Sequence, residues 1–246
     1  MKPIAIFYHV YQKEKTTHNP HTICWEDMFR EQINRIKSVG LFDVTHFIQV
    51  NVNGNKELPI NARKIRIKYN SEMQCESDTL LDLWNFANNH KNYAILYFHT
   101  KGISFIDSDM ERYVNSMIWR EYLEFFNIDL WKINLEKLND HDTSGTELVL
   151  KAGIGGSVWS APCYAGNFWW ANASYICNLD PTYIIRRDRI WWRWASEFWL
   201  GTKNPKMFNF YSSSGQFGKD KYFDPVTKEE AINNIQNNTV YGVYNE

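Results

Sequence analysis

The sequence lacks an excess of charge of either sign, because 27 lysines and arginines stand against 28 aspartates and glutamates in 246 residues. A protein that grips a nucleic-acid backbone needs a basic surface, and a net charge of −1 provides none beyond a local cleft. We therefore expect no nucleic-acid partner. Glycine and proline are also sparse, at 12 and 7 residues, which excludes collagen-like and low-complexity chains.

Long apolar runs are missing as well. No stretch reaches the roughly 18 apolar residues that a membrane-spanning helix requires. The apolar run Ile4–Phe7 is short, and Tyr8 and His9 follow it where a signal peptide would have small residues for cleavage. We therefore expect a buried first strand, no transmembrane segment and a cytoplasmic protein.

Cysteine is scarce, and its spacing indicates no metal site. CxxC spacing and a histidine at zinc-finger distance are both missing around Cys24, Cys75, Cys163 and Cys177. We expect four reduced thiols. A chain of this length with 44% hydrophobic residues can bury roughly 70 to 75% of its unfolded surface, so it needs neither a disulfide nor a metal for stability.

The first part of the chain alternates between strand-like and helix-like segments. Apolar, β-rich segments are expected at residues 2–11, 46–52, 64–69 and 93–98. Apolar residues recur at helical spacing over residues 25–40 and 77–87, the second helix being capped by Ser77 or Asp78. This alternation predicts an α/β fold with a mostly parallel central sheet flanked by helices.

The second part of the chain is less regular. We expect a helix over residues 109–138 with a break near residue 127, a strand over 147–151, and helices over 173–179 and 189–200. The glycines within residues 152–157 do not suggest a phosphate cradle, because no strand leads directly into a helix there.

Polar residues follow the apolar strands, at Tyr8–His9, Asn51–Gly54 and His99–Gly102. Ligands of parallel α/β sheets bind beyond the carboxyl ends of the strands. Lys101, beside a hydroxyl and a glycine, is suited to meet a diphosphate there, although an ordinary polar strand end is an equally good interpretation.

Tryptophan is concentrated in one region, since seven of the eleven lie between Trp159 and Trp199. The adjacent Trp169 and Trp170 cannot both face one core. One of the two indoles can stack on a sugar ring, with Asn167 binding hydroxyls, but filling of the core by aromatic rings explains either indole about as well.

Two carboxylates are candidates for chemistry. Glu197, within an aromatic segment, is either a general base with a raised pKa or the partner of Arg193 in a helical ion pair. Asp142 can bind sugar hydroxyls or a cation, but residues 142–145 are also a common turn sequence. Asp107 and Asp109 imitate a DxD metal motif in a loop beyond the strand end.

Several of these segments together resemble a known family. In order along the chain they are Tyr8–Tyr11, Glu31–Gln32, Ser38–Leu41, Val52–Gly54, Tyr97–Gly102, Trp119–Arg120, Asp142–Thr143, Gly166–Ala171 and Glu197–Trp199. The set resembles GT-A glycosyltransferases of bacterial polysaccharide clusters and large DNA viruses, distantly similar to rhamnan-synthesis-type transferases. The most specific pieces are Tyr97–Gly102, with the sequence YFHTKG, and Asn167–Ala171, with the sequence NFWWA. The resemblance covers residues 4–201.

The resemblance implies a single GT-A-like domain over residues 1–246. Residues 1–105 would form the nucleotide-sugar-binding half, residues 106–215 the acceptor and catalytic half, and residues 216–246 a C-terminal tail. A typical GT-A enzyme carries DxD at the end of the central strand, where this chain has His99, Thr100 and Lys101. The resemblance therefore leaves open whether a divalent metal, Mn or Mg, takes part.

The implied activity is transfer of a sugar from a nucleoside diphosphate sugar to a hydroxyl of a glycan or glycolipid acceptor, with inversion. Glu197 would take the proton from the acceptor, and Lys101 would offset charge on the leaving diphosphate. The implied nucleotide and donor contacts are His9, Asn53, Thr79, His99, Thr100 and Arg120. The implied sugar and acceptor contacts are Asn167, Trp169, Asp142 and Arg193.

Two other classes of function stay open at this point. A degenerate transferase could bind glycans on its tryptophan surface without turnover, and such a module needs neither a base nor a diphosphate site. A Rossmann-type methyltransferase or dehydrogenase is a poorer interpretation, because the first strand ends in Tyr8–Tyr11 and not in GxGxxG. Affinity for nucleotides separates the transferase from the binding module.

Overall fold

The first part of the chain folds as alternating strands and helices, as the sequence predicts. The computed structural model describes residues 2–14, 22–60, 63–70, 76–105, 110–150, 161–185 and 192–211, together with 229, 232 and 233. The elements of this part are β1 (Ile4–Tyr11), α1 (Trp25–Ser38), α2 (Leu41–Val44), β2 (Phe47–Asn53), β3 (Ile65–Tyr69), α3 (Ser77–Asn89) and β4 (Ala94–His99).

The second part contains shorter elements. A 3-10 turn, η1 (Ile103–Phe105), leads to α4 (Met110–Glu124), a π-helical segment η2 (Phe125–Asp129) and α5 (Trp131–Lys137), so the predicted break in this helix is confirmed. Then follow β5 (Thr143–Gly145), β6 (Leu148–Val149), β7 (Cys163–Tyr164), β8 (Trp169–Asn172), α6 (Ala173–Ile176), α7 (Thr182–Ile185), α8 (Trp192–Phe198), η3 (Trp199–Gly201) and β9 (Met207–Asn209).

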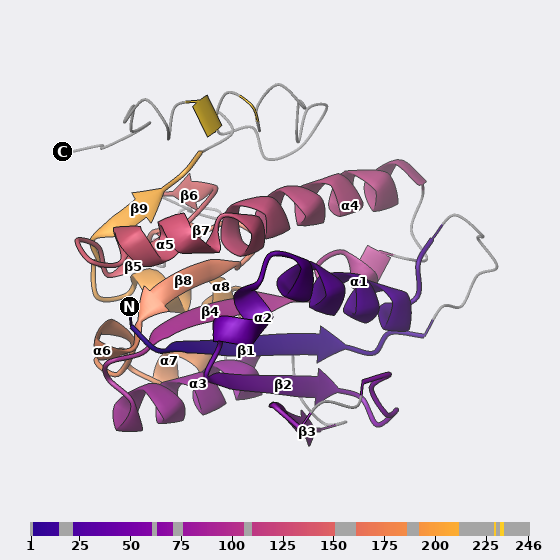
Figure 1. Cartoon of the computed structure of the whole chain (residues 1–246), viewed down its shortest axis with the longest axis horizontal. Helices are drawn as coiled ribbons and strands as arrows, with labels where there is room; N and C mark the ends of the chain where they lie inside the picture. Colours follow the sequence, from indigo (N-terminus) through magenta and orange to yellow (C-terminus); the bar gives the residue numbers. More distant parts are fainter. Residues whose placement is uncertain are drawn as a thin grey trace.

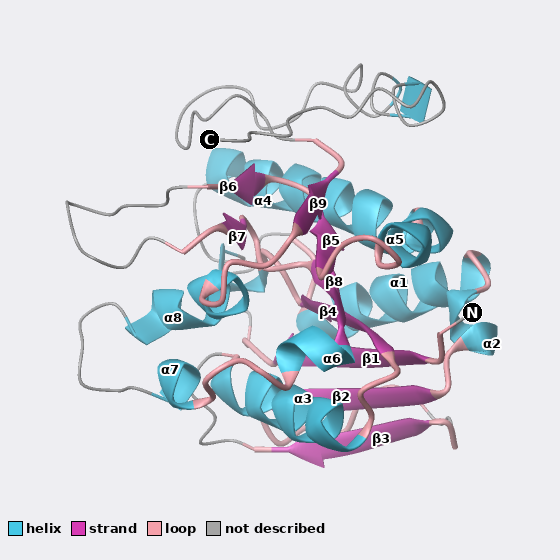
Figure 2. Cartoon of the chain, turned by 90° about the vertical axis from the view of Figure 1, so that its left-hand side faces the viewer, coloured by secondary structure: helices cyan, strands magenta, loops and turns pink. Residues whose placement is uncertain are grey.

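Seven strands form the central sheet in the order β3-β2-β1-β4-β8-β5-β9, and Figure 2 shows them stacked in this order. Only β8 runs against its neighbours β4 and β5; the other pairs are parallel. The predicted α/β fold with a mostly parallel sheet flanked by helices is confirmed. A separate antiparallel pair joins β6 and β7.

The two faces of the sheet carry separate hydrophobic cores, because successive side chains of a strand point to opposite faces. Ile6 and Tyr8 of β1 pack toward α1 and α4, which lie side by side in Figure 1. Phe7 of β1 and Tyr97 of β4 pack toward α3 and α6 on the other face. The two central strands are thus buried on both sides, which explains the nearly continuous apolar sequence of β4.

The order of the strands reverses between β1 and β4. The chain builds outward from β1 through β2 to β3, and then returns to add β4 on the other side of β1. In open parallel sheets such a reversal leaves a crevice beyond the carboxyl ends of the two strands, where ligands bind. The fold therefore predicts a ligand site at the carboxyl ends of β1 and β4, which is called the crevice below.

The start of α3 differs from the prediction. Neither Ser77 nor Asp78 caps this helix: the N-cap residue is Glu76, and no side chain caps the helix. Ser77 Oγ instead donates to Ile184 O, at 3.3 Å, and the Asp78 carboxylate accepts from Asn70 Nδ2, at 2.6 Å. Both side chains therefore form hydrogen bonds to segments outside α3 instead of capping it.

The predicted turn and strand after α5 are also corrected. Residues Thr143–Gly145 form the buried strand β5. Of the predicted strand at 147–151, the structure describes residues 147–150, and Leu148–Val149 are extended. Ser144 Oγ donates to Asn134 Oδ1 at 2.7 Å, which satisfies a polar side chain inside the core. A polar strand of this kind has no apolar alternation by which the sequence could reveal it.

Two simple expectations concern cysteines and membrane spans. The described cysteines Cys24, Cys163 and Cys177 are free thiols. In the part of the chain that the structure describes, no helix has the length and apolar character needed to cross a bilayer.

Candidate functional site

The carboxyl ends of β1 and β4 are tied together by Thr100. His9 and His99 are register partners at these two ends. Thr100 N donates to His9 O at 3.1 Å, and Thr100 Oγ1 accepts from Tyr11 N at 2.9 Å. The hydroxyl of Thr100 thus binds the backbone of β1 and fixes the position of the chain directly after β4.

Glu76 is the centre of the polar group at this edge, and the sequence analysis did not single it out. Its Oε2 accepts from Tyr97 Oη at 2.6 Å and from Asn167 Nδ2 at 2.5 Å. Its Oε1 lies 3.8 Å from His99 Nε2, and 19% of the side chain is exposed. Its place directly before the helix that follows β3 was the only sequence signal for it.

Asn167 donates a hydrogen bond to Glu76, and its side chain makes hydrogen bonds to two further residues. Its Nδ2 also donates to Ser196 O at 3.4 Å, and its Oδ1 accepts from Trp169 Nε1 at 2.7 Å. Asn167, Trp169 and Trp170 are all at most 1% exposed. The predicted use of Asn167 and Trp169 as sugar contacts is therefore corrected: both are buried, and they orient Glu76.

The adjacent tryptophans face opposite cores, as the sequence requires. Trp169 packs with Tyr97 on the α3 face, while Trp170 belongs to the core on the α1 face. Trp170 Nε1 donates to Asn127 O in η2 at 2.8 Å. Neither indole offers a flat surface to solvent, so stacking of a sugar ring on them is excluded in this conformation.

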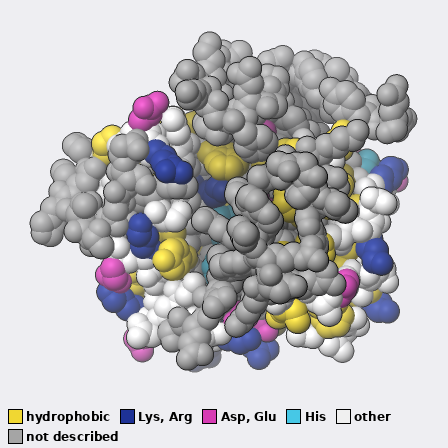
Figure 3. All heavy atoms as spheres, turned by 180° about the vertical axis from the view of Figure 1, so that it is seen from behind, with side chains coloured by type: hydrophobic (Ala, Val, Ile, Leu, Met, Phe, Trp, Pro, Cys, Tyr) yellow, Lys and Arg dark blue, Asp and Glu magenta, His cyan; other side chains and the backbone are white. Residues whose placement is uncertain are grey.

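Lys101 follows His99 and Thr100 at the mouth of the sheet. Its Nζ lies 4.0 Å from the centre of the Trp119 ring, a cation–π contact. The same indole packs against Gly166, whose φ of +90° and nearness to Leu123 leave no room for a Cβ. Gly166 O lies 2.9 Å from His99 Nε2. Figure 3 shows histidine, Lys or Arg, and hydrophobic surface next to one another near the middle of the face opposite to Figure 1.

The charge of Glu76 is stabilised by its surroundings. Burial alone would raise the pKa of this carboxyl, but His99, His9, the Tyr97 hydroxyl and Lys101 together lower it below its usual value. Glu76 is therefore ionised at neutral pH, and it is an acceptor of hydrogen bonds only.

His9 is held neutral. Burial lowers its pKa to about 4, and the nearby charge of Glu76 only partly opposes this effect, while His99 adds to it. His9 Nδ1 lies 3.0 Å from Thr79 Oγ1 of α3. His9 and Thr79 are thus buried and hydrogen-bonded to each other. Their predicted direct contact with the nucleotide is corrected, since both side chains can only support the site from within the protein.

The neutral state of His9 makes stability depend on pH. The pKa falls from 6.5 in the unfolded chain to about 4 in the fold, so the unfolded state binds the extra proton between these values. The part of the stability that depends on neutral His9 is therefore fully present above pH 6.5, and it is lost as the pH falls toward 4. Relative to His9→Asn, the wild type should lose about 3 kcal/mol more between pH 7 and pH 4.

Urea unfolding at the two pH values measures this loss, and His90→Asn, at an exposed histidine after α3, is the control. The control should follow the wild type. Equal pH dependence of the wild type and His9→Asn would show that His9 titrates alike in both states.

A second polar group supports the end of β4 from the opposite face. Gln32 Nε2 donates to His99 O at 3.2 Å and to Glu124 Oε1 at 2.7 Å, and Gln32 Oε1 accepts from Tyr8 Oη at 2.5 Å. Gln32 is completely buried. The main chain at His99 is thus hydrogen-bonded through side chains of α1.

Arg120 belongs to this second group and not to the one around Glu76. Its Nη2 donates to Glu31 at 2.8 Å, and its Nε lies 3.6 Å from Glu124 Oε1. Burial raises the pKa of Glu124, against the charges of Arg120 and Arg35. Within the described residues, Arg120 Nε and Nη1 are buried without a hydrogen-bond partner.

Two other predicted contacts lie apart from Glu76. Asn53 ends β2 beside Tyr11, at the same edge of the sheet but two strands from β4. Asp142 precedes β5 at the opposite, amino-terminal edge, where its carboxylate accepts from Lys206 N at 2.8 Å. The structure thus does not bring Asp142 to the crevice.

Glu197 lies on α8, next to the residue that contacts Asn167. The Ser196 carbonyl accepts from Asn167, which ties α8 to the polar group around Glu76. Burial, and then the charge of Glu197, raise the pKa of the Cys163 thiol in β7 to about 12. The side chain of Arg193 lies outside the described residues, so the predicted Arg193 to Glu197 pair stays a prediction.

The donor set at the end of β4 does not fit a divalent metal. Lys101 is itself a cation, and the carbonyl of Gly166 requires a proton on His99 Nε2, which cannot then bind a metal. Counting only the described residues, no three His, Cys, Asp or Glu side chains could together hold a metal ion. Asp107 and Asp109 lie outside the described residues. We derive no step through a metal.

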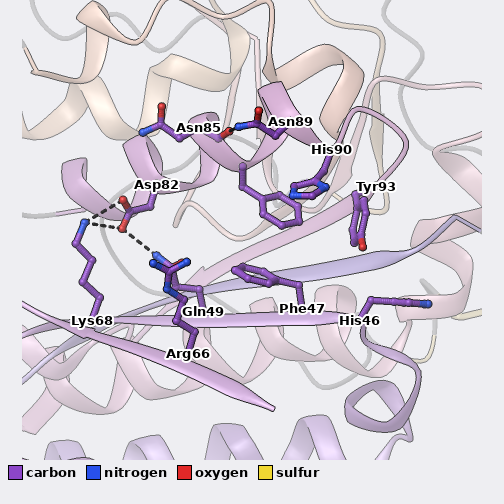
Figure 4. Close-up of a pocket in the computed structure, with 11 residues that line it drawn as sticks. His46, Phe47, Gln49, Arg66, Lys68, Asp82, Asn85, Asn89, His90 and Tyr93 are labelled. Carbon is purple, nitrogen blue, oxygen red and sulfur yellow. Dashed lines mark hydrogen bonds and ion pairs between the residues drawn. The ribbon is translucent and has the colours of Figure 1, made fainter. Parts of the chain in front are cut away.

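A hollow of about 450 Å³ lies apart from the strand ends, between α3 and the strands β2 and β3 (Figure 4). His46 and Tyr93, which precede β2 and β4, place it toward the amino-terminal edge of the sheet. Within it Asp82 pairs with Lys68 at 2.9 Å and accepts from Gln49 Nε2 at 2.8 Å. None of the residues predicted for the site lines this hollow.

The chain belongs to the family described as a domain of unknown function, DUF8361, which matches residues 7–222. No curated protein matches the sequence. The bifunctional IspDF from Campylobacter jejuni is similar with a TM-score of 0.42 and 6% identity, over 86% of this chain and 50% of that one. This chain thus spans about half the length of that protein.

A second solved structure, a 4-diphosphocytidyl-2C-methyl-D-erythritol synthase, is similar with a TM-score of 0.39 and 8% identity, over 94% of this chain and 99% of that one. At these values neither structure identifies the ligand of the crevice.

Proposed function

We propose that the chain is a GT-A-type glycosyltransferase that moves a sugar from a nucleoside diphosphate sugar to a hydroxyl of a glycan or glycolipid, with inversion. One observation carries the proposal. The most specific segment of the family resemblance, Tyr97–Gly102, includes the end of β4, where the strand order reverses, and Lys101 follows that end. Nucleotides bind at this place in open parallel sheets.

The reaction needs a group that stabilises the leaving diphosphate. In the proposed step the acceptor oxygen attacks the anomeric carbon while the bond from that carbon to the phosphate oxygen breaks. Lys101, held over Trp119, faces the negative charge that develops on the diphosphate. The positive end of this site is thus supplied by the chain's own residues.

The reaction also needs a base on the acceptor side. Glu197 is assigned to take the proton of the attacking hydroxyl. The contact of α8 with Asn167, through the Ser196 carbonyl, supports this assignment. His9, Thr79 and His99 form the floor of the nucleotide half, and Asn53 extends it along β2. Arg120 lies beside Glu124, which accepts from Gln32, and Gln32 in turn donates to the His99 carbonyl at the end of β4.

The alternative of a non-catalytic glycan-binding module has less support. It depends on a tryptophan surface on which glycans could stack, and Trp169, Trp170 and Trp199, the tryptophans of that region whose side chains the structure describes, are buried. The cation at the strand end also has no purpose in binding neutral glycans, whereas a diphosphate needs it.

A thermal-shift screen tests the proposal. UDP-glucose, GDP-mannose and dTDP-rhamnose are each added to the whole chain, because a ligand present at 100 times its Kd stabilises the fold by about 2.7 kcal/mol. We expect a shift with at least one of them, and a crystal structure with that nucleotide bound at the ends of β1 and β4. A shift with oligosaccharides alone, and none with nucleotides, would support the binding module instead.

A further inference from the structure

We infer that Glu76 Oε1 is the acceptor for adjacent ring hydroxyls of the bound ligand, so that this carboxylate selects a polyhydroxylated substrate. The inference rests on the proposed function, since it names the part of the substrate that the same crevice recognises. It assigns a role to a residue outside the segments that carry the family resemblance.

The two oxygens of Glu76 have different surroundings. Oε2 is occupied by Tyr97 Oη and Asn167 Nδ2, at 2.6 and 2.5 Å. Oε1 makes no hydrogen bond within the part of the chain that the structure describes, and it lies 3.8 Å from His99 Nε2, which is beyond hydrogen-bond distance. Because 19% of the side chain is exposed, the less occupied oxygen is the one available to a ligand.

The orientation of this oxygen is fixed by parts of the chain far apart in sequence. Tyr97 comes from β4, while Asn167 precedes β8 and is held in turn by Trp169 Nε1 at 2.7 Å. Asn167 has a φ of +56°, an uncommon conformation for a residue other than glycine. Such conformations persist where the surrounding structure enforces them, often at binding sites.

The chemistry of Glu76 favours hydroxyl groups over other ligands. An ionised carboxylate can only accept hydrogen bonds, so it repels a phosphate and binds groups that carry O–H. A cation is disfavoured, because Lys101 already contributes positive charge at Glu76. The lowered pKa also makes this carboxylate a weak base, which separates its role from that of Glu197.

Adjacent hydroxyls occur both on the ribose of a nucleotide and on a hexose. The charge of Lys101 helps to lower the pKa of the Glu76 carboxyl, but this effect does not distinguish between the two. The experiment therefore compares ligands that lack one of these sources of hydroxyls.

The test uses Glu76→Gln, which keeps the shape of the side chain and removes its charge. Glu136→Gln makes the same change at an exposed site on α5 and serves as the control. Calorimetry measures Kd for UDP-glucose, UDP, 2′,3′-dideoxy-UDP, inorganic diphosphate and glucose. We expect Glu76→Gln to raise Kd for the hydroxyl-bearing ligand about 10- to 100-fold. The Kd for inorganic diphosphate should not rise, because the variant removes a negative charge near Lys101.

The arms identify the source of the hydroxyls. A loss for UDP that disappears with 2′,3′-dideoxy-UDP assigns Glu76 to the ribose, and a loss for UDP-glucose alone assigns it to the donor sugar. GDP-mannose and dTDP-rhamnose replace the uridine ligands if the wild type prefers another base. Glu76→Asp is a second variant in case Glu76→Gln misfolds. It keeps the negative charge but shortens the side chain, so it should weaken binding of the same ligands.

The outcomes separate this inference from the proposed function. Binding and transfer by the wild type with unchanged Kd in both Glu76 variants would overturn the inference alone. Binding of glucose or a glycan that depends on Glu76, without any nucleotide binding, would overturn the proposed function alone. If the wild type binds none of these ligands, both are wrong.

Discussion

Replacing Lys101 by alanine should lower the rate of sugar transfer about 10²- to 10³-fold, because loss of one group that stabilises developing charge costs this much. Lys101 is a cation directly after the carboxyl end of β4. Its ammonium group lies 4.0 Å from the centre of the Trp119 ring, which fixes its position. The measurement is the initial rate at saturating donor and acceptor, with the donor identified by the nucleotide-sugar screen.

The control for Lys101 is Lys91→Ala, an exposed lysine in the turn before β4. It should retain the rate of the wild type. The same assay in excess chelator should leave residual transfer in the wild type, because a lysine stands where metal-dependent enzymes have a carboxylate. Complete dependence on manganese, together with a nearly normal rate of Lys101→Ala, would contradict this assignment.

The positions of the first strands and helices could be predicted from the sequence because their patterns are local. The apolar run of β4 requires burial on both faces, and helical spacing of apolar residues in α1 and α3 requires one buried face each. The same reasoning correctly separated Trp169 from Trp170, since adjacent residues of a strand must point to opposite sides.

What the sequence could not predict depends on distant contacts. Strand β5 is polar, and its backbone becomes extended only because β8 and β9 pair with it on either side. Glu76 is 91 residues from Asn167, so no local spacing connects them. Single residues such as His9 and Lys101 could therefore be proposed from the sequence, whereas the polar group around Glu76 required the fold.

Sequence patterns also misassigned residues whose polar groups form hydrogen bonds within the protein. Asn167 and Trp169 have the groups that bind sugars, but each of their hydrogen bonds is made to a neighbouring residue. A buried amide must satisfy its own donors and acceptors, so burial decides between a contact to ligand and a contact to protein. Only the structure gives the burial.

Glu197→Gln should abolish transfer while leaving binding of the nucleotide sugar intact. A general base contributes roughly 10²- to 10⁴-fold to the rate, and the neutral amide cannot take the proton. If Glu197 is only the partner of Arg193 in a helical pair, its loss costs about 0.2–0.5 kcal/mol of stability and barely changes the rate. The two interpretations therefore differ at least a hundredfold in turnover.

The measurement combines the initial rate, the Kd for the donor and the anomeric configuration of the product. Glu197→Gln should change the rate alone, whereas Glu76→Gln should raise Kd, because the first residue is assigned to proton transfer and the second to binding. A rate within a few-fold of the wild type would remove Glu197 from the mechanism. Retention of the donor's configuration would remove it too, since a single inverting displacement is what requires a base at the acceptor hydroxyl.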